Sequence, residues 1–463
     1  KKIALISSVM QLLVSVLLVV SFDPSSGRQF VENCSWVPSM GISYSVGADG
    51  ISVAMILLTT VLTPLIIFSS FSRQIVQPRL FFPLILLMQS ALIGVFVATD
   101  GFLFYIFWEL ALIPIYLICL NWGGPDRQRI TLKFFIYTLF GSLLMLVALI
   151  WLSGQTTVHS FSIDAMYALK TGASAQTWLF WAFFIAFAIK MPVFPFHTWQ
   201  PDTYTDAPTQ GTMLLSGIML KMGIYGAIRW LLPITPIAMQ QWGPTAIVLS
   251  VTGVVYASLV AWKQKDFKRL IAYSSIAHVG MIAAGVFTLT REGLQGSLLQ
   301  MLSHGVNVVG LFFIVDIIMN RAGTREADKL GGIRLIAPAF ATVFIIVLLA
   351  SVALPLTNGF VGEFLLMNGI AQYSVWMAAI AGLSIILGAV YMLNSYKNIM
   401  LGPLSVATET FTDLNGAEKA VLYTIVILIF FFGIYPEPII KLVTPSVEAL
   451  HQTLMSSGAL SVR

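Results

Sequence analysis

Three ionisable side chains interrupt long apolar stretches of the sequence. Glu109 lies within YIFWELALIPIYLI, Lys190 within FAIKMPVFPFHTW, and Lys221 is central in GTMLLSGIMLKMGIYGAIRW. A charged side chain at the centre of a bilayer costs roughly 2.5–3.5 kcal/mol on insertion scales, so such residues usually face a protein interior or water and mark ion pathways. We therefore take these three residues as candidate proton-carrying groups.

Further titratable groups follow in later apolar stretches. His278 lies in YSSIAHVGMIAAG, His304 in QMLSHGVNVVGLFFIVD, and Glu363 in LPLTNGFVGEFLLM. A histidine that faces other helices is often only hydrogen-bonded across the interface, and His278 is the weaker of the two candidates. Asp316 is expected near the headgroups, in a structural role. The proposed path across the membrane interior runs through Glu109, Lys190, Lys221, His304 and Glu363.

The first acid and base of this path could act as an electrostatic switch. A nearby carboxylate favours a protonated lysine, so moving Glu109 away from Lys190 would favour proton loss from Lys190. The proton could pass to Lys221 and, through water and His304, to Glu363. The structural alternative is a static buried ion pair between Glu109 and Lys190 that only fixes helix packing.

The composition places these residues in membrane-spanning helices. Of 463 residues, 58% are apolar or aromatic and 10% are charged, whereas soluble domains carry roughly 25% charged residues. The mean hydropathy of +0.89 excludes a soluble enzyme, a nucleic-acid binder and a disordered chain. Spans need about 20 apolar residues. The sequence predicts one all-α polytopic membrane domain over 1–463 with thirteen spans, at 3–20, 50–71, 80–98, 101–120, 130–152, 177–199, 209–231, 244–262, 269–289, 294–319, 335–370, 374–396 and 417–435.

The loop charges set the expected orientation. Most lysines and arginines of the loops fall on the side of Lys1 and Lys2, which the positive-inside rule places in the cytoplasm. The stretch 436–463 is too polar to span and is expected to be an amphipathic tail on the outer face.

Two spans are expected to be broken. Pro192 and Pro355 remove backbone donors inside 177–199 and 335–370, so these helices should open near Lys190 and before Glu363. Paired interruptions point to the ion path of a transporter. Their spacing of five spans fits two inverted five-helix repeats, 80–231 and 244–396. Alternatively, each proline only kinks a packed helix.

The sequence carries no recognisable cofactor motif. Cys34 and Cys119 are too few for an iron–sulfur cluster or a disulfide framework. Neither GxGxxG after a strand nor a phosphate-binding GxxxxGK[ST] loop occurs. We therefore expect neither a cofactor-binding site nor a metal site in this chain.

From about residue 45 to 435 the sequence resembles the antiporter-like subunits of respiratory complex I. The strings that carry the resemblance are YIFWELALIPIYLI, FAIKMPVFPFHTWQPDTYTDAPTQGTMLLSGIMLKMGIYG, KRLIAYSSIAHVGMI and MLSHGVNVVGLF. It most resembles the M type, also called chain 4, because Glu363 stands where the L and N types carry lysine. The WELALIPIY string also fits the M type.

The resemblance implies a proton-pumping subunit of NADH-quinone oxidoreductase with fourteen helices, including two discontinuous ones. Glu109 and Lys190 match its paired acid and lysine, Lys221 and His304 its central lysine and histidine, and Glu363 its outlet acid. NAD, FMN, iron–sulfur clusters and quinone are expected in partner subunits. Other complex I membrane subunits, including neighbouring antiporter-like chains, and lipids are the expected partners. The expected location is a bacterial cytoplasmic membrane or an organelle inner membrane.

The sequence departs from the family pattern in two places. The family usually has a histidine at the position of Tyr204, and the family's first helix is expected to precede residue 1. Two other functions stay open: a subunit of a multi-subunit cation/proton antiporter, and a non-pumping scaffold with static buried charges. A scaffold should keep full pumping after Lys221→Ala.

Overall fold

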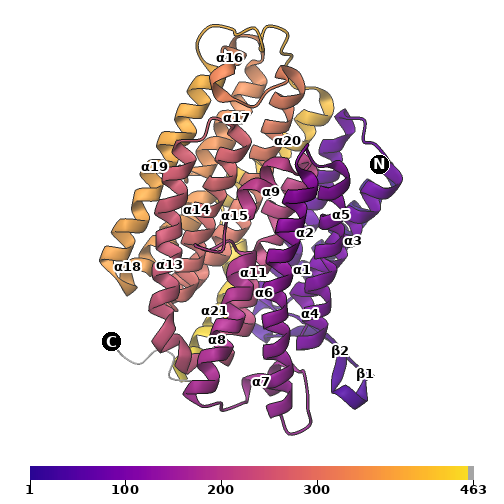
Figure 1. Ribbon diagram of the computed structural model, residues 1–463, viewed down its shortest axis with the longest axis vertical. Helices are drawn as coiled ribbons and strands as arrows, with labels where there is room; N and C mark the ends of the chain where they lie inside the picture. Colours follow the sequence, from indigo (N-terminus) through magenta and orange to yellow (C-terminus); the bar gives the residue numbers. More distant parts are fainter. Residues whose placement is uncertain (457–463) are drawn as a thin grey trace.

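The structure, a computed structural model, describes residues 1–456 and is a bundle of long helices (Figure 1). Twelve of the described helices or helix runs are long and apolar enough to cross a membrane. This confirms the predicted all-α polytopic fold. The crossing helices are α1 (Lys2–Ser21), α2 (Gly50–Ser69), α3 (Pro78–Val97), α4 (Gly101–Leu110) with α5 (Leu112–Trp122), α6 (Arg127–Gln155), α8 (Ala173–Lys190), α10 (Thr209–Leu214) to α12 (Leu232–Ile234), α13 (Pro236–Trp262), α14 (Phe267–Phe287), α15 (Arg291–Ala322), α19 (Val375–Met400) and α20 (Gly416–Ile434).

The eleventh predicted span, 335–370, is divided into two shorter helices. α17 (Pro338–Ser351) and α18 (Asn358–Tyr373) are separated by residues 352–357, so the chain opens before Glu363 as predicted. The break at the first proline also lies where the sequence placed it, because α8 ends at Lys190. The predicted span 177–199 was wrong at its end, since residues 191–199 form turns that lead into the short helix α9 (Gln200–Asp206).

A β-hairpin that the sequence did not predict fills most of the connection between α1 and α2. Strand β1 (Gln29–Val37) pairs antiparallel with β2 (Ile42–Ala48), and Gly41 closes the turn with a left-handed φ of 67°. The hairpin lies at the same end of the bundle as the short helix α7 (Ile163–Tyr167), whereas α16 (Ile333–Ile336) lies at the opposite end (Figure 1).

One aspartate connects this hairpin to the helix that carries Glu109. The carboxylate of Asp100 caps α4 by accepting hydrogen bonds from the N–H groups of Phe102 and Leu103. The same carboxylate accepts one from the N–H of Ser43 in β2 at 3.1 Å. The hairpin therefore fixes the start of α4 and, two turns further on, the position of Glu109.

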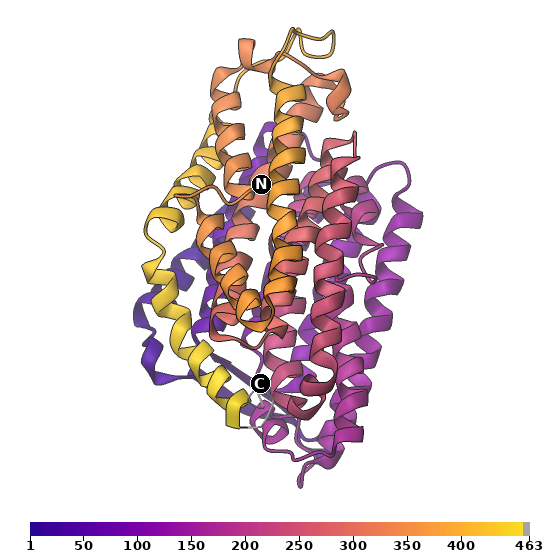
Figure 2. The ribbon, with the colours of Figure 1, turned by 90° about the vertical axis from the view of Figure 1, so that its left-hand side faces the viewer.

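Residues 437–456 form one further helix, α21 (Glu437–Ser456), which packs obliquely against α2 and α15 along a flank of the bundle (Figure 2). Its buried side chains are apolar, and it also bonds to the bundle through polar atoms: the hydroxyl of Ser446 accepts from the N–H of Gly50 at 3.0 Å. Of the predicted tail 436–463, residues 457–463 lie outside the described residues.

Two glycines allow the central helices to cross closely. A Cβ atom on Gly305 of α15 would lie 2.9 Å from the carbonyl oxygen of Gly217, and a Cβ on Gly217 would lie 2.7 Å from Val309. Small residues let membrane helices approach at backbone distance. This crossing lies beside His304 and close to Lys221, so it positions the centre of the predicted path.

Candidate functional site

Lys221 and His304 form a buried pair at the centre of the bundle. The Nζ atom of Lys221 lies 2.8 Å from the Nδ1 atom of His304 and donates a second hydrogen bond, of 2.6 Å, to the carbonyl oxygen of Ser216. Lys221 is 0% exposed and His304 5% exposed. No carboxylate neutralises Lys221 by an ion pair within the described part of the chain.

The helix around Lys221 is not regular. Leu215–Met219 and Ala227–Leu231 are π-helical, on either side of α11 (Lys221–Gly226). A π-turn displaces the ordinary backbone pairing and is frequent at functional sites. The first of these turns contains Ser216, whose carbonyl oxygen accepts the bond from Lys221. The sequence predicted one uninterrupted helix here, because no proline or glycine pattern marks a π-turn.

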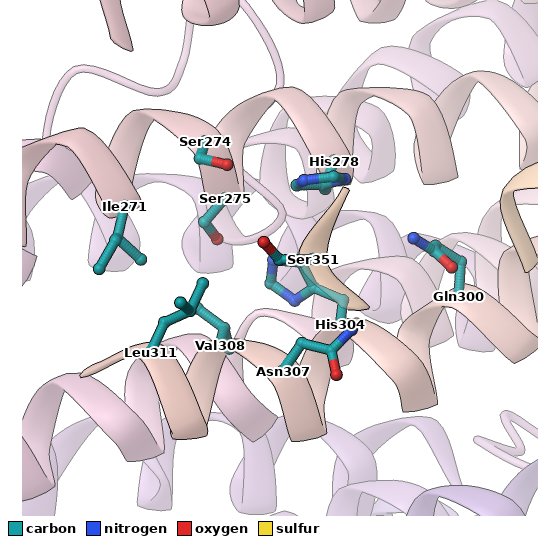
Figure 3. Close-up of a pocket in the computed structure, with 10 residues that line it drawn as sticks. All are labelled: Ile271, Ser274, Ser275, His278, Gln300, His304, Asn307, Val308, Leu311 and Ser351. Atoms are coloured by element: carbon teal, nitrogen blue, oxygen red, sulfur yellow. The ribbon is translucent and has the colours of Figure 1, made fainter. Parts of the chain in front are cut away.

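His278 and Glu363 form the second buried pair. The Nδ1 atom of His278, on α14, lies 3.1 Å from Oε1 of Glu363, on α18. The ring of His278 is centred 6.0 Å from the ring of His304. A small cavity of about 20 Å³, enough for a water molecule, is lined by both histidines. Figure 3 shows the two rings on opposite walls of this cavity, which α14 and α15 provide.

Glu109 and Lys190 do not form an ion pair. No oxygen of Glu109 lies within 4.0 Å of Lys190 Nζ, and Glu109 Oε1 and Lys190 Nζ are both buried without a hydrogen-bond partner among residues 1–456. Instead, Lys190 Nζ lies 5.2 Å from the ring centroid of Trp108, the residue next to Glu109. This geometry argues against the static ion pair that the sequence left open. The lysine ends α8, where the helix dipole favours a positive charge.

The helices of the two lysines touch through backbone. A Cβ atom on Gly223, two residues after Lys221, would lie 2.8 Å from both the N atom of Met191 and the carbonyl oxygen of Phe187. Met191 directly follows Lys190. Because α8 ends after Lys190 and Gly223 has no side chain, the end of the Lys190 helix lies directly against the helix of Lys221.

A larger cavity of about 620 Å³ is lined by the loops that follow α5 and α9, the start of α14 and the end of α15. Lys268 lines it, is 5% exposed, and donates a 2.6 Å bond to the carbonyl oxygen of Ala207. Near it, Asp316 pairs with Arg73 at 3.0 Å and accepts from the hydroxyl of Thr209. Asp316 is thus buried in a hydrogen-bonded network with Arg73 and Thr209, which supports the structural role expected for it.

The acidic, histidine and cysteine side chains of the described residues are dispersed. Within residues 1–456, no group of three or more histidine, cysteine, aspartate or glutamate side chains is arranged to hold a metal ion. Cys34 and Cys119 are both free, the first exposed and the second buried. Proton transfer is the chemistry that the two buried pairs, Lys221 with His304 and His278 with Glu363, can support.

The sequence and the fold both match known proteins. Residues 98–388 match the family described as NADH:quinone oxidoreductase/Mrp antiporter, transmembrane. NADH-quinone oxidoreductase subunit M of Rickettsia typhi is 43% identical over 97% of this chain and 91% of its own length. The chain belongs to this family. Among solved structures, a chain of respiratory complex I from Thermus thermophilus is 31% identical with a TM-score of 0.91, over 97% of this chain and 94% of that one.

Another solved structure shares the fold at lower identity. A chain of the Mrp complex from Dietzia sp. is 19% identical with a TM-score of 0.85, over 99% of this chain and 94% of that one. This likeness extends to the fold alone. The antiporter-like architecture is therefore common to chains whose sequences have diverged widely.

In this antiporter-like chain, the structure brings four of the six predicted site residues into one connected group: Lys221, His304, His278 and Glu363. Sequence reasoning ranked His278 as the weakest, yet it lies between His304 and Glu363. The sequence around His278, which lies ten residues after Lys268 on α14, does not indicate that this histidine contacts the other two residues. Tyr204, where the resemblance predicts a histidine, is fully buried in α9 and packs edge-on against Phe312.

Proposed function

We propose that this chain is the M-type membrane subunit of a proton-translocating NADH-quinone oxidoreductase in a cytoplasmic or organelle inner membrane. The single observation that carries the proposal is the connected group of buried titratable side chains, because static scaffolding needs no neighbouring bases in a bilayer interior. The relatives named subunit M match over nearly the whole chain, which supports the choice of complex.

In the proposed mechanism, the proton passes laterally through the bundle. Withdrawal of the Glu109 carboxylate from Lys190 favours proton loss from that lysine. The proton is taken up by Lys221, whose Nζ already contacts His304 Nδ1. From His304 it crosses the water-sized cavity to His278, and from Nδ1 of His278 it reaches Oε1 of Glu363. After each transfer, the side chain that has given up its proton can accept the next one.

The remaining assignments follow from membership of such a complex. NAD, FMN, iron–sulfur clusters and quinone belong to partner subunits, and electron transfer there drives the movement of Glu109. Neighbouring antiporter-like chains and lipids are the proposed partners, and nucleic acid is not one. We also propose that 80–231 and 244–396 are inverted repeats, each with one broken helix at residues 191–199 or 352–357.

A subunit of a multi-subunit cation/proton antiporter is the second candidate. A chain of an Mrp complex shares the fold of this chain, so the fold is compatible with this second function. Glu363 and the string WELALIP favour the oxidoreductase, because they are the features of the M type. Exchange of sodium for protons by the purified complex without NADH or quinone would favour the antiporter.

The deciding experiment compares Lys221→Ala with Lys441→Ala in the reconstituted complex. Lys441 is an exposed lysine that pairs with Glu437 on the surface of α21. Proton pumping and electron transfer are measured together, with assembly checked by subunit composition. We expect Lys221→Ala to lose pumping and Lys441→Ala to keep it. Unchanged pumping per electron in both variants would leave this chain as a scaffold.

A further inference from the structure

Lys268 is a buried base that the proposed path does not use. It lies at the start of α14 and lines the cavity of about 620 Å³, which reaches the surface at the exposed residues Pro125 and Gly323. Its Nζ atom donates to the carbonyl oxygen of Ala207 at 2.6 Å, but no carboxylate lies within 4.0 Å of it among residues 1–456. The loops around the cavity belong to the side rich in lysine and arginine, which the positive-inside rule assigns to the cytoplasm. Lys268 is therefore a base without a bonded acid, placed between the cytoplasm and the bundle interior.

One face of α14 leads from Lys268 to the cavity between the histidines. Ile271, Ser275 and His278 follow Lys268 in steps of three, four and three residues, and such steps stay on one face of a helix. All three line the water-sized cavity (Figure 3). The Oγ atom of Ser275 is buried there without a hydrogen-bond partner in the part of the chain that the structure describes. At the rise of an α-helix, Lys268 and Ser275 are only about 10 Å apart along the axis.

An apolar layer of three side chains, Ile271, Val308 and Leu311, separates the two cavities. All three are buried and line one end of the cavity between the histidines. Figure 3 shows Ile271 of α14 facing Val308 and Leu311 of α15 across this end. Beyond the layer, Asp316 of α15 pairs with Arg73, which lines the larger cavity. Along both helices, polar groups therefore lie on either side of a single apolar layer.

The layer interrupts any chain of hydrogen bonds between the cavities. None of its three side chains has a nitrogen or oxygen atom, so a water molecule between them would find no side-chain partner there. Hydrophobic constrictions of this kind gate ion pathways by losing and regaining water. On either side of the layer, Lys268 and Ser275 offer water the polar partners that it needs. Entry of one or two water molecules would therefore complete a path for protons.

We propose that Lys268 takes up protons from the cytoplasm and that the apolar layer is the gate through which they join the path. This inference rests on the proposed function, because it supplies the protons that the path carries. The neutral amine of Lys268 binds a proton from the water of the larger cavity. When water enters the layer, this proton passes along it to His278, whose Nδ1 atom faces Glu363, and Lys268 is neutral again. While the layer is dry, protons in the central cavity cannot return to the cytoplasm.

The test measures the passive proton leak of vesicles that hold the intact complex without electron donor or quinone. A pH step is applied on the Lys268 side and followed with a pH-sensitive dye trapped inside the vesicles. Leu311→Ser places a hydroxyl group and space in the layer. Leu294→Ser is the matched control, since Leu294 is a similarly buried leucine of α15 that lines neither cavity. Val308→Thr, which keeps the side-chain volume, replaces Leu311→Ser if that variant does not assemble.

We expect Leu311→Ser to leak about tenfold faster than Leu294→Ser, which corresponds to about 1.4 kcal/mol of the barrier. Adding Lys268→Met to Leu311→Ser should remove most of this leak. Equal leaks in the two serine variants overturn the gate, and a leak that Lys268→Met leaves unchanged overturns Lys268 as the entry. Pumping by Lys221→Ala decides the proposed function separately. Lost pumping there, with a tight Leu311→Ser complex, removes the gate and keeps the path, whereas unchanged pumping there overturns the proposed function itself.

Discussion

Lys221 Nζ and His304 Nδ1 lie 2.8 Å apart in the centre of the bundle. An ammonium group can only donate, so His304 must be neutral at Nδ1 whenever Lys221 is charged. If His304 is charged, Lys221 must be a neutral amine that accepts. The pair can therefore hold at most one excess proton between two bases, which is the arrangement that a relay needs and a static ion pair lacks.

Replacing Lys221 by arginine tests this sharing directly. Arginine keeps a positive charge and cannot lose its proton in a protein. We expect Lys221→Arg to assemble and to lose nearly all proton pumping, whereas a purely electrostatic role for Lys221 would survive the change. Lys441→Arg on the surface is the matched control, and pumping by reconstituted complex is the measurement. Substantial pumping by Lys221→Arg would contradict the relay.

His278 is the connection between His304 and Glu363, although its sequence context marks it only weakly. We expect His278→Asn to reduce pumping about as strongly as Glu363→Gln, because asparagine keeps a polar group but cannot carry a proton. The same change at His159, an exposed loop residue with a positive φ that asparagine tolerates, should have no effect. Equal pumping in the two histidine variants would remove His278 from the path.

Variants of Glu109 and Asp49 distinguish an acid with a functional role from an acid with a structural role. Asp49 caps α2 and pairs with Arg229, so Asp49→Asn breaks a largely buried ion pair. We expect this variant to lose about 3 kcal/mol of stability. Glu109→Gln should leave the thermal midpoint of the complex nearly unchanged, since Glu109 makes no ion pair within residues 1–456, and should lower pumping. A large loss of stability in Glu109→Gln would indicate a static partner for this carboxylate.

Gly223 is expected to be irreplaceable for packing. An added methyl group would meet the backbone of α8 at 2.8 Å, a distance that real Cβ contacts do not reach. Gly223→Ala should therefore lower the thermal midpoint or prevent assembly. Overpacking of this kind typically costs about 1–3 kcal/mol. Gly154→Ala, where no atom lies within 4 Å, is the matched control and should leave the thermal midpoint unchanged.

Asp413 makes stability depend on pH at the end of the bundle where α16 lies. Burial acts to raise its pKa, but hydrogen bonds from three backbone N–H groups outweigh burial and hold the pKa below its ordinary value. Two of these donors, Ala339 and Phe340, begin α17. A depressed folded-state pKa gives stability that is present above the unfolded-state pKa of about 3.9 and is lost as pH falls through the folded-state value.

We therefore expect Asp413→Ala to destabilise α17 by about 1 kcal/mol at neutral pH, the usual effect of losing a cap. Thermal unfolding of the wild type and the variant should converge as the pH falls below about 4. Glu409→Ala, on the same loop, serves as the control. A stability difference between wild type and Asp413→Ala that does not change with pH would show that the carboxylate charge is unimportant.

Which residues lie in the membrane, and where two helices break, could be predicted from the sequence alone. The length of an apolar stretch identifies each membrane crossing, because a helix that spans the bilayer needs about 20 apolar residues. Proline marks the openings after Lys190 and before Glu363, because it removes a local backbone donor. Both signals are local in the chain, and the structure confirms them.

Only the tertiary structure decided how the titratable groups pair. Lys221 meets His304 because two glycines let α15 cross the Lys221 helix closely, and His278 meets Glu363 because α14 and α18 are neighbours. The π-turn that offers the Ser216 carbonyl to Lys221 leaves no local mark either. Contacts between residues 60 to 90 positions apart depend on which faces of different helices are packed together, and that choice is a property of the whole bundle.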